Sequence, residues 1–141
     1  AENPLPIGAD FYNNGYVVSF TVKLNALKAL RIALQNSKGE KIVYYFDTEE
    51  KNFVVDRRKS GLTDFSNNFA DPLIVAPLIP KKSYTIHLWV DKASVEAFVN
   101  GGEVVQTNTV FPTEPYNQLW FDLRGNTVVS VENITLYKIK N

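Results

Sequence analysis

Residues 90–112 read VDKASVEAFVNGGEVVQTNTVFP, a run in which apolar and polar positions alternate between two very short turns. The first turn falls at residues 91–94. The second contains Gly101 and Gly102, and glycine adopts positive φ without steric cost, as a type I′ turn requires. The segment therefore predicts three consecutive antiparallel strands joined by two hairpins.

The turns also predict which side chains share a face, because a shift of one residue would exchange the two faces of the sheet. If Asp91 pairs with Ser94, Val90 lies opposite Val95 on an aliphatic face that we expect to be core. Trp89 then lies opposite Glu96 on the other face. An indole beside a carboxylate on a non-core face indicates a role beyond folding.

The rest of the chain reads as short strands separated by turns, with no helical period over twelve or more residues. The expected strands lie at residues 16–24, 29–35, 41–47, 53–57, 118–123 and, with a bulge, 127–139. Residues 29–35 also fit a helix, but the turn that follows at 36–39 favours a hairpin arm. Residues 1–15 read as an N-terminal loop, and 59–83 as a long irregular connection. This pattern predicts an all-β fold, a two-layer antiparallel β-sandwich of the jelly-roll or lectin type, as a single module over residues 1–141.

Composition narrows the classes of function. Fifteen Lys and Arg balance fifteen Asp and Glu, which argues against nucleic acid or an anionic membrane as the main partner. The chain has no Cys, so disulfides and thiolate chemistry are excluded. It also has no Met, and we therefore expect a fragment or a processed piece of a longer polypeptide.

The sequence shows no recognisable arrangement of catalytic residues. His87 is the single histidine, so a histidine-rich metal site is excluded, and we expect this side chain to be an ordinary residue at the solvent edge of a sheet. Two carboxylates flanking a glycosidic bond remain an option, but no pair stands out by its spacing. We expect no catalytic residue, no metal and no cofactor.

Sugar binding is better supported, since antiparallel sandwiches stack aromatic rings on sugars and hold hydroxyls with carboxylates, amides and Arg. The predicted register places five such residues on one face: His87, Trp89, Glu96, Phe98 and Thr107. The alternative is that these aromatics pack under the 59–83 connection or against another domain. The residues by themselves leave the two interpretations level.

Two motifs in this order resemble the C-terminal β-sandwich of glycoside hydrolase family 32, which contains invertases, levanases and inulinases. They are FVVDRRKSG at residues 53–61 and the 90–112 segment, with an Ala-Pro at 76–77 between them. The resemblance implies a sandwich that normally follows a catalytic five-bladed propeller. The propeller's Asn-Asp-Pro, Arg-Asp-Pro and Glu-Cys motifs are absent, and residues 69–72 (FADP) lack the Arg.

The resemblance therefore implies an accessory module of a fructan-active hydrolase, without the catalytic domain. Some such sandwiches, grouped as carbohydrate-binding module family 66, bind the terminal fructose of levan-type fructans in a shallow pocket. By likeness to them we expect Asp56 and Glu96 to accept sugar hydroxyls and Arg57 to donate. From the predicted register we expect Trp89 to offer a ring face. Asp56 and Arg57 could equally brace the sandwich. The expected partners are fructan or fructose and the parent's propeller, in a secreted, cell-surface or periplasmic enzyme; the alternative is a purely structural module that stabilises the propeller.

Overall fold

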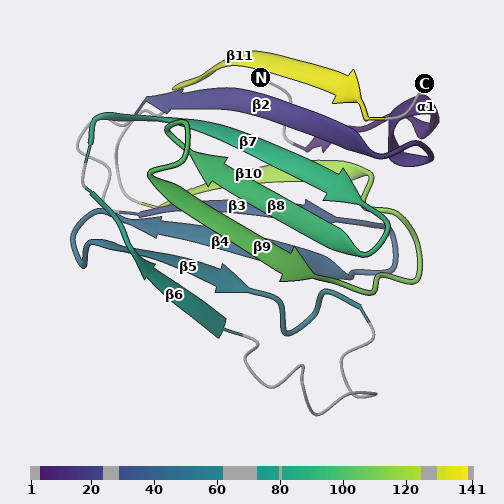
Figure 1. Cartoon of the computed structure of the whole chain (residues 1–141), viewed down its shortest axis with the longest axis horizontal. Helices are drawn as coiled ribbons and strands as arrows, with labels where there is room; N and C mark the ends of the chain where they lie inside the picture. The colour runs from purple at the N-terminus through teal and green to yellow at the C-terminus, as the bar shows by residue number, and fades with distance from the viewer. Residues whose placement is uncertain (1–3, 24–28, 62–72, 80, 125–129, 140–141) are drawn as a thin grey trace.

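The chain folds into two antiparallel sheets packed face to face, as the computed structural model shows (Figure 1). The structure describes residues 4–23, 29–61, 73–79, 81–124 and 130–139. In spatial order, the six-stranded sheet consists of β1 (Leu5–Pro6), β10 (Gln118–Arg124), β3 (Ala29–Gln35), β4 (Lys41–Asp47), β5 (Asn52–Asp56) and β6 (Leu73–Pro77). The five-stranded sheet consists of β11 (Ser130–Lys138), β2 (Tyr16–Lys23), β7 (Ser83–Asp91), β8 (Ser94–Val99) and β9 (Val104–Thr109). The predicted two-layer antiparallel sandwich is confirmed.

The register predicted for residues 90–112 is confirmed pair by pair. Trp89 lies opposite Glu96 in the β7–β8 hairpin, and Val90 lies opposite Val95. The second turn holds Gly101 and Gly102 at φ of 71° and 117°, and Asn100 joins them at 52°. Asn is one of the few residues besides glycine that visits this left-handed region readily.

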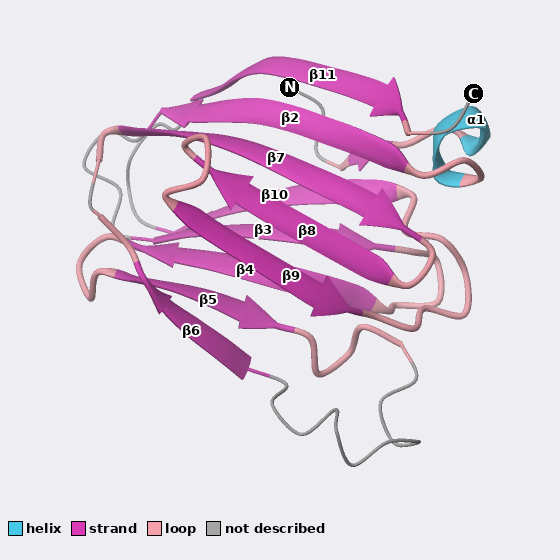
Figure 2. Cartoon of the chain, viewed as in Figure 1, coloured by secondary structure: helices cyan, strands magenta, loops and turns pink. Residues whose placement is uncertain are grey.

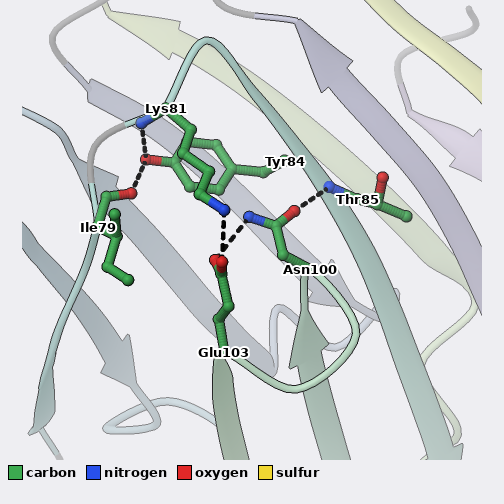
Figure 3. Close-up of polar contacts among 6 residues, drawn as sticks. All are labelled: Ile79, Lys81, Tyr84, Thr85, Asn100 and Glu103. Carbon is green, nitrogen blue, oxygen red and sulfur yellow. Dashed lines mark hydrogen bonds and ion pairs between the residues drawn. The ribbon is translucent and has the colours of Figure 1, made fainter.

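A polar cluster fixes this second turn to the start of β7 (Figure 3). The Asn100 side chain accepts the Thr85 N–H at 2.9 Å and donates to Glu103 at 3.0 Å, while Glu103 also forms an ion pair with Lys81. The Tyr84 hydroxyl accepts the Lys81 N–H and donates to the Ile79 carbonyl. The turn and the connection into β7 are thereby held together by side chains as well as by backbone.

The core lies between the sheets and takes one residue in two from most strands. In β5, for example, Phe53 and Val55 are fully buried while the intervening Val54 is only partly covered. Aromatic edges pack across the layers, as in the T-shaped pair of Phe20 and Phe121 with ring centroids 5.2 Å apart. Strands such as β5, β7 and β8 bury only one face, so their other face is at least partly exposed.

Three elements differ from expectation. The N-terminal segment contains β1 and a four-residue helix, α1 (Ala9–Tyr12), and the 59–83 connection contains strand β6 (Figure 2). These elements are too short to produce a recognisable period, and β6 ends at a proline, which edge strands tolerate. Part of that connection, residues 62–72, lies outside the described residues. The bulge expected in the last strand is confirmed by a register shift between Glu132 and Thr135.

A buried tyrosine offers a test of this core. The hydroxyl of Tyr44 lies in the interior with no hydrogen-bond partner among the described residues, and burial raises its pKa. Leaving a buried polar atom unpaired costs about 1–3 kcal/mol, so Tyr44→Phe is expected to leave the free energy of unfolding unchanged or raise it by about 1 kcal/mol. Tyr16→Phe is the matched control, since the Tyr16 hydroxyl donates to the Tyr116 carbonyl at 2.9 Å. Urea unfolding should show a loss of about 1 kcal/mol for the control, and an equal loss in both variants would contradict the prediction.

Candidate functional site

The two motifs singled out in the sequence meet at one edge of the sandwich. Gly61 has a φ of 149°, and a Cβ added there would lie 2.1 Å from the carbonyl oxygen of Phe111. Nearby, the Ser60 carbonyl accepts the Tyr116 hydroxyl, and Arg57 Nη1 donates to the Thr109 carbonyl at 3.1 Å. The end of the Asp-Arg…Ser-Gly motif, which follows β5 of the six-stranded sheet, thus packs against the chain at and after the end of β9 in the five-stranded sheet. This contact is called here the joint between the two sheets.

Arg57 belongs to this joint. Only 9% of its surface is exposed, and its guanidinium bonds to main chain at the end of β9. This placement argues against the expected contact between Arg57 and a sugar. It supports the alternative in which Arg57 braces the sandwich.

Asp56, one residue earlier, points the other way, because neighbouring residues in a strand face opposite sides. It lies on the outer face of the six-stranded sheet, where Arg58 holds its carboxylate with two guanidinium bonds, Nε–Oδ1 at 3.0 Å and Nη2–Oδ2 at 2.7 Å. The Arg58 backbone N–H donates to Oδ1 as well, at 3.0 Å. A bidentate pair of this kind fixes the orientation of both side chains.

A hollow of about 410 Å³ opens beside this pair across β3, β4 and the chain that follows β5. Its lining consists of Arg31, Lys41, Val43, Tyr45, Asp56, Arg58 and Lys59. The guanidinium of Arg31 lies 5.4 Å from the centre of the Tyr45 ring. The hollow, called here the Asp56 pocket, thus combines a carboxylate, guanidinium and ammonium donors and a partly exposed aromatic ring.

The carboxylate of this pocket stays ionised. Partial burial by itself would raise the pKa of Asp56, but the hydrogen bonds from Arg58 and the charges of Arg58 and Arg31 lower the pKa below its ordinary value. Asp56 therefore accepts hydrogen bonds, and cannot donate them, across the whole neutral and mildly acidic range.

The outer face of the five-stranded sheet holds the other two expected site residues. Trp89 is 45% exposed with its ring 6.5 Å from that of Phe98, and Glu96 accepts the Thr107 hydroxyl at 3.4 Å. His87, also on this face, shares a 2.6 Å hydrogen bond with the Ser19 hydroxyl. The sharing of one face by Trp89 and Glu96 is confirmed by the register.

The four expected site residues therefore do not converge on one pocket. Asp56 lies on one outer face, Trp89 and Glu96 lie on the opposite one, and Arg57 lies between the layers. Sequence reasoning missed Arg31, Arg58 and Tyr45, which share the Asp56 pocket. A signal existed for Tyr45, since alternation in residues 41–47 places it on a non-core face, but strand order was needed to join β3, β4 and β5.

Two further hollows occur in the described part of the chain. A groove of about 410 Å³ runs beside Trp89 on the five-stranded sheet, lined by Val17, Ser19, His87, Trp89, Thr135, Tyr137, Lys138 and Ile139. A pocket of about 320 Å³ lies at the end of the sandwich beside α1 and the β7–β8 turn, and includes Tyr12, Asp91 and Glu114. Among the described residues, no group of three or more His, Asp or Glu could hold a metal ion. No helix in that part is long and apolar enough to cross a membrane.

An antiparallel sandwich with hollows on its outer faces belongs to a broad class that includes both lectins and accessory domains. Its fold resembles that of exo-inulinase from Aspergillus awamori, with a TM-score of 0.78 and 24% identity over 98% of this chain and 26% of that one. Galectin LEC-6 from Caenorhabditis elegans shares the fold at a TM-score of 0.69 and 14% identity, over 97% of this chain and 92% of that one.

Sequence comparison assigns the family. The family "Glycosyl hydrolases family 32 C terminal" matches residues 6–138, and the chain belongs to it. A levanase from Bacillus sp. (strain L7) is 33% identical over 67% of this chain and 10% of its own length. An extracellular exo-inulinase from Aspergillus awamori is 30% identical over 86% of this chain and 23% of its own length. A sucrose-6-phosphate hydrolase from Streptococcus mutans is 29% identical over 72% of this chain and 20% of its own length. The chain thus spans less than a quarter of these relatives, and the resemblance stated above is confirmed.

Proposed function

We propose that this domain is an accessory carbohydrate-binding module of a secreted fructan-active glycoside hydrolase, and that it binds fructose units in the Asp56 pocket. One observation carries the proposal. A fixed, ionised carboxylate, two guanidinium groups and a partly exposed tyrosine line one shallow hollow on a rigid sheet. Sugar sites need hydroxyl acceptors, hydroxyl donors and apolar surface together.

Each group has a defined part in this proposal. The carboxylate of Asp56 offers roughly four lone-pair sites, of which Arg58 occupies three, so it has capacity to accept a sugar hydroxyl. Arg58 and Arg31 donate to ring or hydroxyl oxygens, and the ring of Tyr45 lies against the apolar part of the sugar. Arg58 thus takes the donor role first assigned to Arg57.

The family supports the substrate class. Relatives named levanase and exo-inulinase share 30–33% of aligned residues with this chain, and one of them is named extracellular. The chain covers only the smaller part of each, so the catalytic groups of such a parent are proposed to lie in another domain, as the missing propeller motifs indicate.

Isothermal titration with levan, inulin and fructose tests the proposal. The domain is expected to bind at least one of them, and Asp56→Asn is expected to weaken binding about tenfold or more, since it removes a charge-assisted bond of about 1.5–3 kcal/mol. Because the pKa of Asp56 is lowered, binding should persist from neutral pH down to about pH 4, where an ordinary Asp protonates. Trp89→Ala, on the opposite face, is the matched control and should bind normally.

The control also decides between the two faces. Loss of binding in Trp89→Ala or Glu96→Gln, with Asp56→Asn unaffected, would move the site to the five-stranded sheet. Absence of heat with all three sugars at millimolar concentration would end the binding proposal altogether.

A second candidate function is structural support of a catalytic propeller. The observation in its favour is the outer face of the five-stranded sheet, where Trp89, Val105, Tyr137 and Ile139 are large apolar residues exposed by 38–58%. Exposed apolar patches of this kind mark interfaces. Under this alternative the isolated domain binds no sugar, and it self-associates or binds added propeller through this face.

A further inference from the structure

The Asp56 pocket is strongly cationic although the chain as a whole is neutral. Four of its lining residues carry a positive charge (Arg31, Lys41, Arg58 and Lys59), and one carries a negative charge. The lining thus carries an excess of three positive charges around one small hollow.

The charges are placed on fixed backbone. Lys41 begins β4, and its N–H donates to the carbonyl of Lys59 at 2.7 Å, so the two lysines leave adjacent points of the chain. The carboxylate of Asp56 is already held by Arg58, which leaves its charge largely offset within that pair. The ammonium groups of Lys41 and Lys59 therefore make the electrostatic potential positive at their end of the pocket.

Such an excess is more than a neutral sugar requires. Hydroxyls need single donors and acceptors, whereas guanidinium and ammonium groups gathered around one hollow suit an oxyanion such as a phosphate group. The ring surface of Tyr45 and the carboxylate remain beside these cations for the sugar itself.

We propose that the Asp56 pocket accepts an anionic saccharide, with the sugar against Tyr45 and Asp56 and a phosphate group between Lys41 and Lys59. This inference rests on the proposed sugar site and names the kind of sugar that it prefers. The same charge chemistry also attracts free phosphate, and the experiment separates the two sources.

Titrations with fructose 6-phosphate, fructose and inorganic phosphate at low ionic strength test the inference. Fructose 6-phosphate is expected to bind about tenfold more tightly than fructose, and the difference should shrink as NaCl approaches about 1 M, where the Debye length is about 3 Å. In Lys41→Met/Lys59→Met the preference is expected to vanish, so that fructose 6-phosphate and fructose bind with equal affinity. Lys92→Met removes an exposed lysine at the other hollow and should change nothing.

The outcomes separate this inference from the proposed function. Equal affinities for the two sugars would overturn the inference and leave the fructan site standing. A preference that survives the double lysine substitution would overturn it as well. Phosphate binding that the double variant removes, without binding of fructose or levan, would support the anion site and overturn the proposed fructan function.

Discussion

Replacing Gly61 with alanine is expected to lower the free energy of unfolding by about 3 kcal/mol or more. Two penalties act at this position. The residue has a φ of 149°, a conformation that costs an L-residue about 1–3 kcal/mol. The new methyl group would also lie 2.1 Å from the Phe111 carbonyl oxygen, and relieving a contact with backbone requires the two chain segments to separate.

Gly39→Ala isolates the contribution of the close approach. Gly39 also has a positive φ, 78°, but a Cβ built there meets nothing within 4 Å. Gly39→Ala should therefore lower the free energy of unfolding by about 1–2 kcal/mol, which is the cost of the backbone conformation alone. Urea unfolding measures the free energy of unfolding of both variants. Equal losses would mean that the backbone around Gly61 moves to make room for the methyl group at no cost, and would contradict the prediction.

Arg57→Met is expected to cost about 2–4 kcal/mol of unfolding free energy. The substitution keeps most of the aliphatic stem but removes a buried guanidinium, and hydrogen bonds to charged groups contribute about 1.5–3 kcal/mol. The Thr109 carbonyl would also lose its donor at the point where the two sheets are held together.

The adjacent arginine provides the comparison. Arg58 is mostly exposed, and surface ion pairs are worth about 0–1 kcal/mol, so Arg58→Met should be nearly neutral for stability. The effects on levan binding should be reversed, with Arg57→Met binding normally while folded and Arg58→Met binding weakly. If Arg58→Met lost as much stability as Arg57→Met, this would contradict the assignment of a structural role to Arg57 and of sugar binding to Arg58.

The turns of residues 90–112 were sufficient to predict the β7–β8–β9 pairing, because two short loops leave a single register that buries Val90 and Val95. The candidate site was less accessible to such reasoning. Asp56 and Arg58 are close in sequence, but Arg31 reaches them only through the order β3–β4–β5. The turn at residues 36–39 indicates the β3–β4 hairpin, but the sequence does not show that the outward side chains of the three strands meet in one hollow.

Arg57 shows a second limit. The Asp-Arg motif carries the family resemblance, yet a residue can recur in a family for packing as readily as for ligand contact. The alternation rule already places Asp56 and Arg57 on opposite sides of the chain, so one of the two was bound to point inward. Which one did so depended on whether Phe53 and Val55 or Val54 faced the core, and three consecutive apolar residues left both options open.

The pairing of β2 with β11 has a consequence for synthesis. Within the five-stranded sheet, residues 16–23 are made before every other strand, but their partner strand, residues 130–138, is made after all the others. At roughly 10 residues per second, an apolar strand waits about 10 seconds with one edge open, and such edges recruit other chains. The nascent domain is thus most vulnerable to aggregation before its final strand emerges, and cotranslational folding of the five-stranded sheet cannot finish until that strand has cleared the exit tunnel.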